Sequence, residues 1–542
     1  MCRAATRIDK RWLVFGAALL ALGVGLFIHR RFFHDDAYIS LRYGERLLAG
    51  KGLTWNDGER VEGFSNPLWL AQIVLLGLLG VPLALAAQIL GILYALATVV
   101  LWVGTDMGTL KGFPYPPAMV RRRQSRRAPH ATRADPAGLL VLVTIPGWTL
   151  WALGGLETIG ACFWILMSLV LVWAMRDAPP SRARGLAFGF SLAAVALGRP
   201  EGIAVSLTLL CVAAFARRGR DLVLAAAPLA VLWGGYQIFR LAYFGDWIAN
   251  AARAKALDLP LGALLADATT YAIASAREWL AAALVATWLI VHSPDRRRVW
   301  VLLLPCLPLF ALIVAGGGDH MPGSRFMLAP VAVLCLAGSL AAPSLRGGVR
   351  AATLVLVLGS ALWQLQLSWR HPAARNPAAA LGEFVGRAIE DRLPPGTLVA
   401  AATAGSLPYF ARSLSFIDTL GINDRHIART LPVPLPRALS QPDSWFAVPG
   451  HRRGDGPYVL SRRPDLIVLG GAHGDIDPWF LGDFQLLMSE RFRADYAPWR
   501  LLVPVPSSYQ PWVVDQIDPQ TGRLPIALYV RRDSRVWPAI AR

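Results

Sequence analysis

The chain has 542 residues, of which 55% are hydrophobic and only 16% charged, and it carries a formal net charge of +19 with a mean hydropathy of +0.44. Soluble domains carry roughly 25% charged residues, so this composition excludes an ordinary soluble enzyme, a disordered protein and a small disulfide-built module. The apolar residues form long blocks, which is typical of a polytopic α-helical membrane protein.

Residues 1–368 are predicted to form a bundle of about eleven transmembrane helices. The first apolar run, 12–28, follows basic residues but precedes no small-x-small cleavage site, so we expect an uncleaved helix. The run 67–80 is short of the roughly 20 residues that a full span needs, and it is predicted to be interfacial or re-entrant. The other predicted spans are residues 83–103, 138–153, 159–175, 185–197, 203–215, 222–244, 271–291, 300–315, 326–342 and 351–367.

Clusters of arginine and lysine recur between the apolar runs, the largest at residues 111–133. A nucleic-acid binder would gather such charge on one folded face, whereas cytoplasmic loops of membrane proteins show this repeated pattern. When 67–80 is not counted as a span, every cluster lies on the cytoplasmic side. The sequence therefore predicts a multi-pass membrane protein, with its N-terminus inside and its C-terminus outside.

Residues 369–542 are predicted to form a soluble α/β domain on the outer side. Short apolar runs at 397–402 and 466–469 alternate with Gly/Pro turns and with helical stretches such as 378–393. The five cysteines of the chain all lie before this segment, so no disulfide framework is expected in it, and no zinc-ligand spacing is present in the sequence.

The predicted topology gathers polar residues on the outer face. The first outer loop, residues 29–66, contains the adjacent carboxylates Asp35 and Asp36. Neighbouring carboxylates raise each other's pKa, so one could act as a general base, or the pair could hold a divalent cation; solvated loop acids are the alternative. At three outer helix ends lie Arg199, Arg240 and Arg325, which suit phosphate, with snorkelling to lipid headgroups as the alternative.

The first outer loop also carries a resemblance to a known family. Residues 35–43 (DDAYISLRY), 50–53 (GKGL) and 59–69 (ERVEGFSNPLW) resemble the GT-C class of membrane glycosyltransferases, and most closely the family of the mycobacterial terminal β-(1→2)-arabinofuranosyltransferase. This chain departs from the family's pattern at residues 247–250 and at His320, which leaves the identity of the sugar and the finer substrate contacts open. The similarity continues in order through residues 155–158, 199–202, 243–245, 254–255, 317–319, 325, 417–428 and 450–465.

The resemblance implies an active site outside the cytoplasm. The donor would be a polyprenyl-phosphate sugar, with decaprenyl- or undecaprenyl-phosphate arabinofuranose as the best match. The acceptor would be a cell-envelope glycan. Asp35 or Asp36 would assist attack by the acceptor hydroxyl. The leaving phosphate would be held by some combination of Arg199, Arg240, Lys255 and Arg325. Supporting or substrate-contacting residues would be Tyr38, Arg42, Tyr43, Glu62, Asn66, Trp69, Glu157, Glu201, Asp319 and His320.

The outer domain would then bind the acceptor glycan. Its polar candidates are Asp418, Asn423, Asp424, His426, His451 and Asp455. No cofactor is implied with certainty, and a divalent cation is left open.

Two other functions are compatible with a membrane bundle that carries outer polar residues. A transporter or flippase of lipid-linked sugars would place ionisable residues near the bilayer midplane and often shows repeats, neither of which is evident here. A membrane protein that binds glycan without catalysis would need the outer domain but not the acid pair. The sugar, the acceptor polymer, the stereochemical outcome and the oligomeric state are not determined by the sequence.

Overall fold

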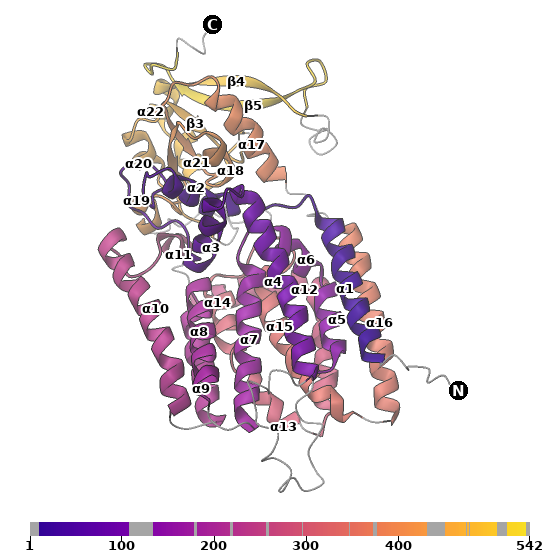
Figure 1. The fold of residues 1–542 in the computed structure, drawn as a ribbon. Coiled ribbons are helices and arrows are strands. Elements are labelled where there is room, and N and C mark those ends of the chain that lie inside the picture. Colours follow the sequence, from indigo (N-terminus) through magenta and orange to yellow (C-terminus); the bar gives the residue numbers. More distant parts are fainter. Residues whose placement is uncertain are drawn as a thin grey trace.

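A computed structural model of the chain describes residues 10–107, 134–177, 181–216, 220–255, 260–294, 296–345, 347–371, 377–430, 450–472, 474–475, 477–506 and 517–537. The basic segment 111–133, on which the predicted topology partly depends, lies outside these ranges. The described residues form a helical bundle with a mixed α/β part above one end of it (Figure 1).

Long helices make up the bundle, with α1 and α16 side by side at one edge and α10 at the opposite edge (Figure 1). They are α1 (Lys10–His29), α4 (Leu83–Met107), α7 (Thr158–Asp177), α8 (Arg182–Gly198), α9 (Gly202–Ala216), α10 (Arg220–Phe244), α12 (Leu261–Val291), α15 (Arg325–Ala341) and α16 (Gly347–Arg370).

Several bundle elements are short or broken. The helices α5 (Pro136–Thr144) and α6 (Pro146–Leu153) meet at an angle of 66°. The break falls at Ile145, whose extended ψ of 126° is the conformation that a following proline favours. The other short elements are α3 (Pro67–Leu78), α13 (Arg296–Val299), η2 (Trp300–Leu303), α14 (Cys306–Ala315) and η3 (Ala342–Ser344).

The helices agree with a multi-pass membrane protein. Among the described residues, six helices are long and apolar enough to cross a membrane, and the number rises to seven if the bent pair α5–α6 is counted as one span. Each of the other predicted spans is helical but shorter than a full crossing, so the figure of eleven stays a prediction. The segment predicted to be interfacial or re-entrant forms α3, with 12 residues.

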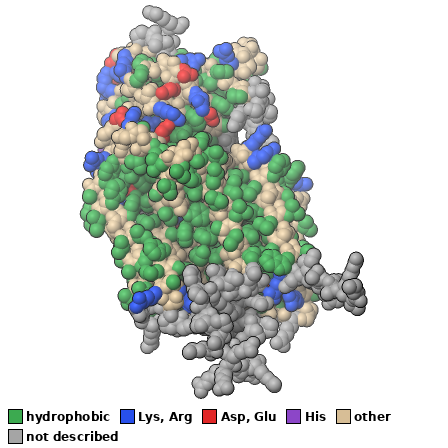
Figure 2. Space-filling model, in the orientation of Figure 1, with side chains coloured by type: hydrophobic (Ala, Val, Ile, Leu, Met, Phe, Trp, Pro, Cys, Tyr) green, Lys and Arg blue, Asp and Glu red, His purple; other side chains and the backbone are tan. Residues whose placement is uncertain are grey.

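The surface of the bundle suits lipid. Hydrophobic side chains cover it in Figure 2, whereas acidic and basic side chains gather over the α/β part and some Lys and Arg lie at the opposite end. On α10, Val231 and Ile238 are 70% and 71% exposed. Such exposure of large apolar side chains is unfavourable in water and favourable in hydrocarbon.

The α/β part contains a five-stranded sheet in the order β2-β1-β3-β5-β4. The predicted strand regions 397–402 and 466–469 are β1 (Leu398–Ala401) and β3 (Leu466–Val468), which run parallel to each other and to β2 (Ser415–Asp418). The long hairpin of β4 (Tyr496–Pro504) and β5 (Arg523–Arg531) adds antiparallel strands. The helices of this part are α17 (Pro377–Glu390), α18 (Ser406–Phe410), α19 (Arg425–Arg429), α20 (Gly456–Ser461), α21 (Leu481–Leu487) and α22 (Glu490–Asp495).

The first outer loop joins the two parts. It folds into the amphipathic helix α2 (Ala37–Leu48), from which the buried Arg42 donates hydrogen bonds to the backbone carbonyls of Trp55, Pro408 and Leu414. Asn56 binds the backbone of Phe416 through both its amide nitrogen, at 2.7 Å, and its carbonyl oxygen, at 3.1 Å. A buried cation and a buried amide are tolerated only when hydrogen-bonded, so these contacts fix the α/β part against the bundle.

Candidate functional site

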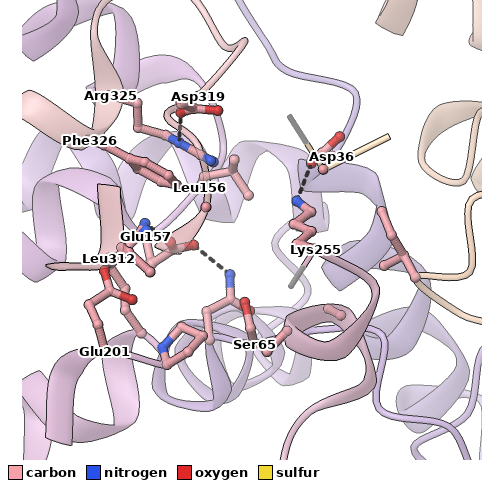
Figure 3. Close-up of a pocket in the computed structure, with 18 of the residues that line it drawn as sticks. Asp36, Ser65, Leu156, Glu157, Glu201, Lys255, Leu312, Asp319, Arg325 and Phe326 are labelled. Carbon is pink, nitrogen blue, oxygen red and sulfur yellow. Dashed lines mark hydrogen bonds and ion pairs between the residues drawn. The ribbon is translucent and has the colours of Figure 1, made fainter. Parts of the chain in front are cut away.

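A cavity of about 280 Å³ lies where the first outer loop meets the ends of several bundle helices (Figure 3). The helix α11 (Asn250–Lys255) and the loop between α14 and α15 complete its wall. Its volume lies near the lower end of the range for small-molecule pockets, which suits a sugar ring and a phosphate group better than a long glycan. The charged residues and histidine that line it are Asp36, Glu157, Arg199, Glu201, Lys255, Asp319, His320 and Arg325.

Asp36 lines the cavity and forms an ion pair with Lys255, at 3.3 Å between Oδ2 and Nζ. The backbone N–H of Asp36 donates to Nδ1 of the buried His34 at 3.2 Å, and burial lowers the pKa of His34 to about 4. Burial alone would raise the pKa of the Asp36 carboxyl, but Lys255 and then His34 outweigh it and hold that pKa below its usual range. Asp36 is therefore an ionised carboxylate paired with one lysine.

Asp35 is not among the residues that line this cavity, although it is the neighbour of Asp36. Its Oδ1 accepts hydrogen bonds from the backbone N–H of Ser406, at 2.9 Å, and from the Ser406 hydroxyl at the start of α18. Burial raises the pKa of Asp35 to about 6, in spite of these hydrogen bonds. The two carboxylates thus have different partners, and Asp35 ties the first outer loop to the α/β part.

Arg199 lines the cavity between two carboxylates. Its Nη1 lies 2.7 Å from Glu157, and its Nε pairs with Glu201. Burial lowers the pKa of Arg199, but the two glutamates outweigh this effect and keep it above its usual value. Asn66 donates to the second oxygen of Glu157 at 2.7 Å. Because two acids neutralise one arginine, this group is a weak binder of phosphate as it stands.

Arg325, the first residue of α15, lines the cavity and bonds Asp319 through Nε at 2.9 Å. Its guanidinium carbon lies over the rings of Phe326, at 4.8 Å, and Trp151, at 5.4 Å, which hold its plane. Within the described ranges Arg325 hydrogen-bonds a carboxylate through Nε alone, so its planar fork keeps donors available for an anion.

Arg240 lies away from this cavity. Its Nε and Nη2 bind the two carboxylate oxygens of Glu62 at 2.6 and 3.1 Å, and Tyr236 donates to the same carboxylate. The pair connects α10 to the first outer loop. Of the four cations predicted to hold phosphate, the structure brings Arg199, Lys255 and Arg325 together and places Arg240 outside the cavity lining.

The predicted supporting residues divide into two groups. Asn66, Glu157, Glu201, Asp319 and His320 line the cavity. The others contact the structure around the cavity. Tyr38 packs against the rings of Phe33, Tyr409 and Phe410. Trp69 donates a hydrogen bond to the carbonyl of Gly155, Tyr43 hydrogen-bonds Val61 and Asn423, and Arg42 and Glu62 make the contacts given above.

His320 lines the cavity and contacts the α/β part. The ring of His320 meets the ring of His451 edge to face, with centroids 4.4 Å apart, and Gly450 is part of the cavity lining. Burial lowers the pKa of His320 well below its usual value. Sequence reasoning missed two residues around the acid pair: His34, which its adjacency to Asp35 could have suggested, and Ser406, for which the sequence gives no signal.

Three of the six predicted acceptor-binding residues in the α/β part have clear local roles. Asp418 is buried and accepts from the backbone N–H groups of Leu420 and Asn423, and burial raises its pKa to about 6. Asp424 and Asp455 cap the N-termini of α19 and α20. These aspartates shape the turns that carry their neighbours.

A second, shallow groove of about 920 Å³ lies between the first outer loop, the end of α10 and helices α19 and α20. Asn423, Asp424 and His426 line it, and the ring of His426 stacks on Tyr458 with centroids 4.0 Å apart. The His426 Nε2 lies 2.9 Å from an Asp455 oxygen. Arg60, Tyr243, Arg425 and Arg462 also line it. Three of the six predicted acceptor residues therefore share one groove.

In the part of the chain that the structure describes, no three His, Cys, Asp or Glu side chains are grouped so as to hold a metal ion. A requirement for a divalent cation stays untested.

The geometry so far defines a multi-pass membrane protein with a charged cavity at the junction of its bundle and its α/β part. Two curated relatives are terminal β-(1→2)-arabinofuranosyltransferases. The one from Mycobacterium tuberculosis is 32% identical over 256 residues, 45% of this chain and 38% of that protein. The one from Corynebacterium glutamicum is 26% identical over 393 residues, 64% of this chain and 54% of that protein. The resemblance predicted from the sequence is thus confirmed, and the chain spans about half the length of these relatives or less.

Residues 371–517 match the model of a domain of unknown function, DUF8728. Solved structures also show some likeness. The crystal structure of ArnT from Cupriavidus metallidurans in the apo state has a TM-score of 0.49 at 13% identity, covering 95% of this chain and 97% of that one. The arabinofuranosyltransferase AftD from Mycobacteria has a TM-score of 0.43 at 16% identity, covering 76% of this chain and 32% of that one. These are weak likenesses.

Proposed function

We propose that the protein is a glycosyltransferase that moves a sugar from a polyprenyl-phosphate donor to a glycan hydroxyl on the outer face of a bacterial plasma membrane. One observation carries the proposal: the ionised Asp36 lies in the same cavity as Lys255 and Arg325, at the end of a membrane bundle. A carboxylate beside cations suits a reaction in which a hydroxyl loses a proton while a phosphate leaves.

The reaction can be assigned to these residues with its atoms balanced. The acceptor oxygen forms a bond to the anomeric carbon of the donor sugar, and the bond from that carbon to the phosphate oxygen breaks. The hydroxyl proton passes to Asp36, and polyprenyl phosphate leaves with both electrons of the broken bond. Because the leaving group is an anion, the protein needs to stabilise negative charge there, which Lys255 and Arg325 are placed to do.

The Asp36–Lys255 pair gives the carboxylate a way to become a stronger base. Without donor, Lys255 is the main influence that lowers the pKa of Asp36 against the effect of burial. A donor phosphate would compete for the lysine ammonium, whose side chain is 39% exposed. When Lys255 turns to the phosphate, it no longer counteracts the effect of burial on Asp36. The pKa of Asp36 then rises, so this carboxylate binds the proton of the acceptor hydroxyl more strongly.

The acceptor glycan is proposed to lie along the shallow groove at His426 and Tyr458. The stacked aromatic pair and the nearby carboxylate and amide suit the apolar faces and hydroxyls of sugars. Neighbouring residues line the two spaces: Val61 and Asn423 line this groove, whereas Gly63, Phe64 and Ile422 line the charged cavity. The names of the curated relatives favour arabinofuranose as the sugar. A cell-envelope glycan as the acceptor is proposed from the sequence resemblance alone.

The test is transfer by the purified chain from a synthetic polyprenyl-phosphate arabinofuranose to a short arabinan acceptor. Asp36→Asn keeps the shape of the side chain but removes its basicity, so kcat should fall by about a hundredfold or more. Asp35→Asn, which can still accept from Ser406, is the matched control and should keep most of the activity. Absence of transfer by the wild-type chain with every polyprenyl-phosphate sugar tried, or full activity of Asp36→Asn, would overturn the proposal.

A further inference from the structure

A buried polar network that the proposed reaction does not use lies directly behind Arg325. Glu278, in the middle of α12, is buried within the bundle. One of its carboxylate oxygens lies 3.0 Å from Nε2 of His371, and the other accepts a hydrogen bond from the hydroxyl of Ser324. Both oxygens are thus occupied, as a carboxylate buried among membrane helices requires.

Ser324 has a conformation that needs an explanation. It is a non-glycine residue with φ of 51° and ψ of 43°, in the left-handed region. A serine before a helix ordinarily accepts a hydrogen bond from the helix N-terminus, but the Ser324 side chain makes no such cap. It is turned to Glu278 instead. Strained backbone of this kind persists only where the surroundings hold it, and it is concentrated at functional sites.

The position of Ser324 controls two residues of the cavity. Arg325 follows it directly as the first residue of α15. The loop before it turns sharply through Gly317, Gly318 and Gly323, each with positive φ, and carries Asp319, which bonds Arg325. A change of Ser324 to an ordinary conformation would redirect the backbone at the point from which the Arg325 side chain begins, and would move that side chain relative to Asp319.

His371 links this network to the α/β part. It directly follows α16, and the next described element along the chain is α17 of the α/β part. Its side chain is buried with that of Glu278, at 6% and 9% exposure. The residue that binds Glu278 therefore lies where the chain leaves the bundle on its way to the α/β part.

We propose that Glu278 and His371 are positioning residues: through Ser324 they hold Arg325 and Asp319 in the geometry that binds the phosphate of the lipid donor. The inference rests on the proposed function, and it adds a defined connection between the joint of the two parts and the cavity. Neither residue touches the cavity itself, so both act through Ser324.

The experiment compares variants of the purified full chain for binding of undecaprenyl phosphate, followed by quenching of tryptophan fluorescence. His371→Leu removes the bond to Glu278, whereas His371→Gln retains a donor that can reach it. Ser324→Ala removes the hydroxyl and keeps the strain, whereas Ser324→Gly removes both. The control is Thr353→Val, which breaks another hydrogen bond between α12 and α16, that of Trp288 to Thr353 at 3.1 Å. Trp288 lies about three helical turns along α12 from Glu278.

We expect the dissociation constant for undecaprenyl phosphate to rise about tenfold in His371→Leu and Ser324→Ala, less in Ser324→Gly, and by less than about twofold in His371→Gln and Thr353→Val. In transfer assays the KM for the donor should rise more than kcat falls. If His371→Leu and Ser324→Ala bind as tightly as Thr353→Val, this inference is wrong while the proposed function stands. Failure of the wild-type chain to bind undecaprenyl phosphate would overturn both.

Discussion

Replacing Asp35 by asparagine should stabilise the protein at neutral and alkaline pH. Burial raises the pKa of Asp35 to about 6 from its ordinary 3.8, so the folded state holds this proton more tightly than the unfolded chain does. Stability from such a group is complete below pH 3.8 and is lost as the pH rises through about 6. Asparagine carries no charge to bury and can still accept both hydrogen bonds from Ser406.

The size of the effect follows from the pKa difference. A difference of about 2 in pKa corresponds to about 3 kcal/mol at 1.36 kcal/mol for each unit. Asp35 is only partly buried, so about 1.5 kcal/mol is a reasonable lower figure once screening by water is included. For a protein of this size, a change of that order moves the unfolding temperature by a few degrees.

The assay is thermal unfolding of the purified chain in detergent at several pH values between 4 and 8. The difference between Asp35→Asn and wild type should grow from near zero at the acid end to its full value at pH 8. Asp57→Asn, in the same loop, is a control of opposite sign, because the hydrogen bond and charge of Arg46 lower the pKa of Asp57. That variant should be less stable than wild type at pH 8. An Asp35→Asn protein that is destabilised equally at every pH would refute the reasoning.

Two further outcomes test the remaining assignments. Lys255→Met should raise the KM for the lipid donor about tenfold or more, because one phosphate contact is lost and Asp36 is left unpaired. The control is Arg253→Met, on the same helix, where the arginine is paired with Asp246 at 2.7 Å; this variant should change the KM for the donor by less than about twofold. Similar donor KM values for both variants would remove Lys255 from the phosphate site. His426→Ala should raise the KM for the arabinan acceptor about fivefold without changing the KM for the donor, because it removes one ring of the stack with Tyr458. An unchanged acceptor KM would exclude the groove as the acceptor site.

Local sequence patterns predicted the apolar helices of this fold and two of its five strands. The apolar runs became helices, and the two short runs at 397–402 and 466–469 became neighbouring parallel strands. These predictions succeeded because helices and strands follow from the spacing of apolar residues over a few positions. The number of full membrane crossings was harder to predict, since bent and short helices satisfy the same apolar pattern as complete spans.

The sequence predicted the first outer loop as part of the candidate site, but it did not distinguish the two acids of that loop. Asp35 and Asp36 are adjacent, so their side chains leave the backbone in different directions. One meets Ser406, 371 positions further along the chain, and the other meets Lys255, 219 positions away. Contacts across such separations leave no periodic signal in a single sequence.

What the sequence by itself determined is therefore the membrane character of the chain, its apolar helices, two short strands and the loop that bears the acid pair, because each depends on composition or on short-range periodicity. Tertiary structure alone decided that Arg199 is neutralised by Glu157 and Glu201, that Arg240 lies outside the cavity, and that Glu278 reaches Ser324. The reason is physical: the charge that a side chain presents to a substrate depends on its nearest partners, and packing brings those partners from distant parts of the chain.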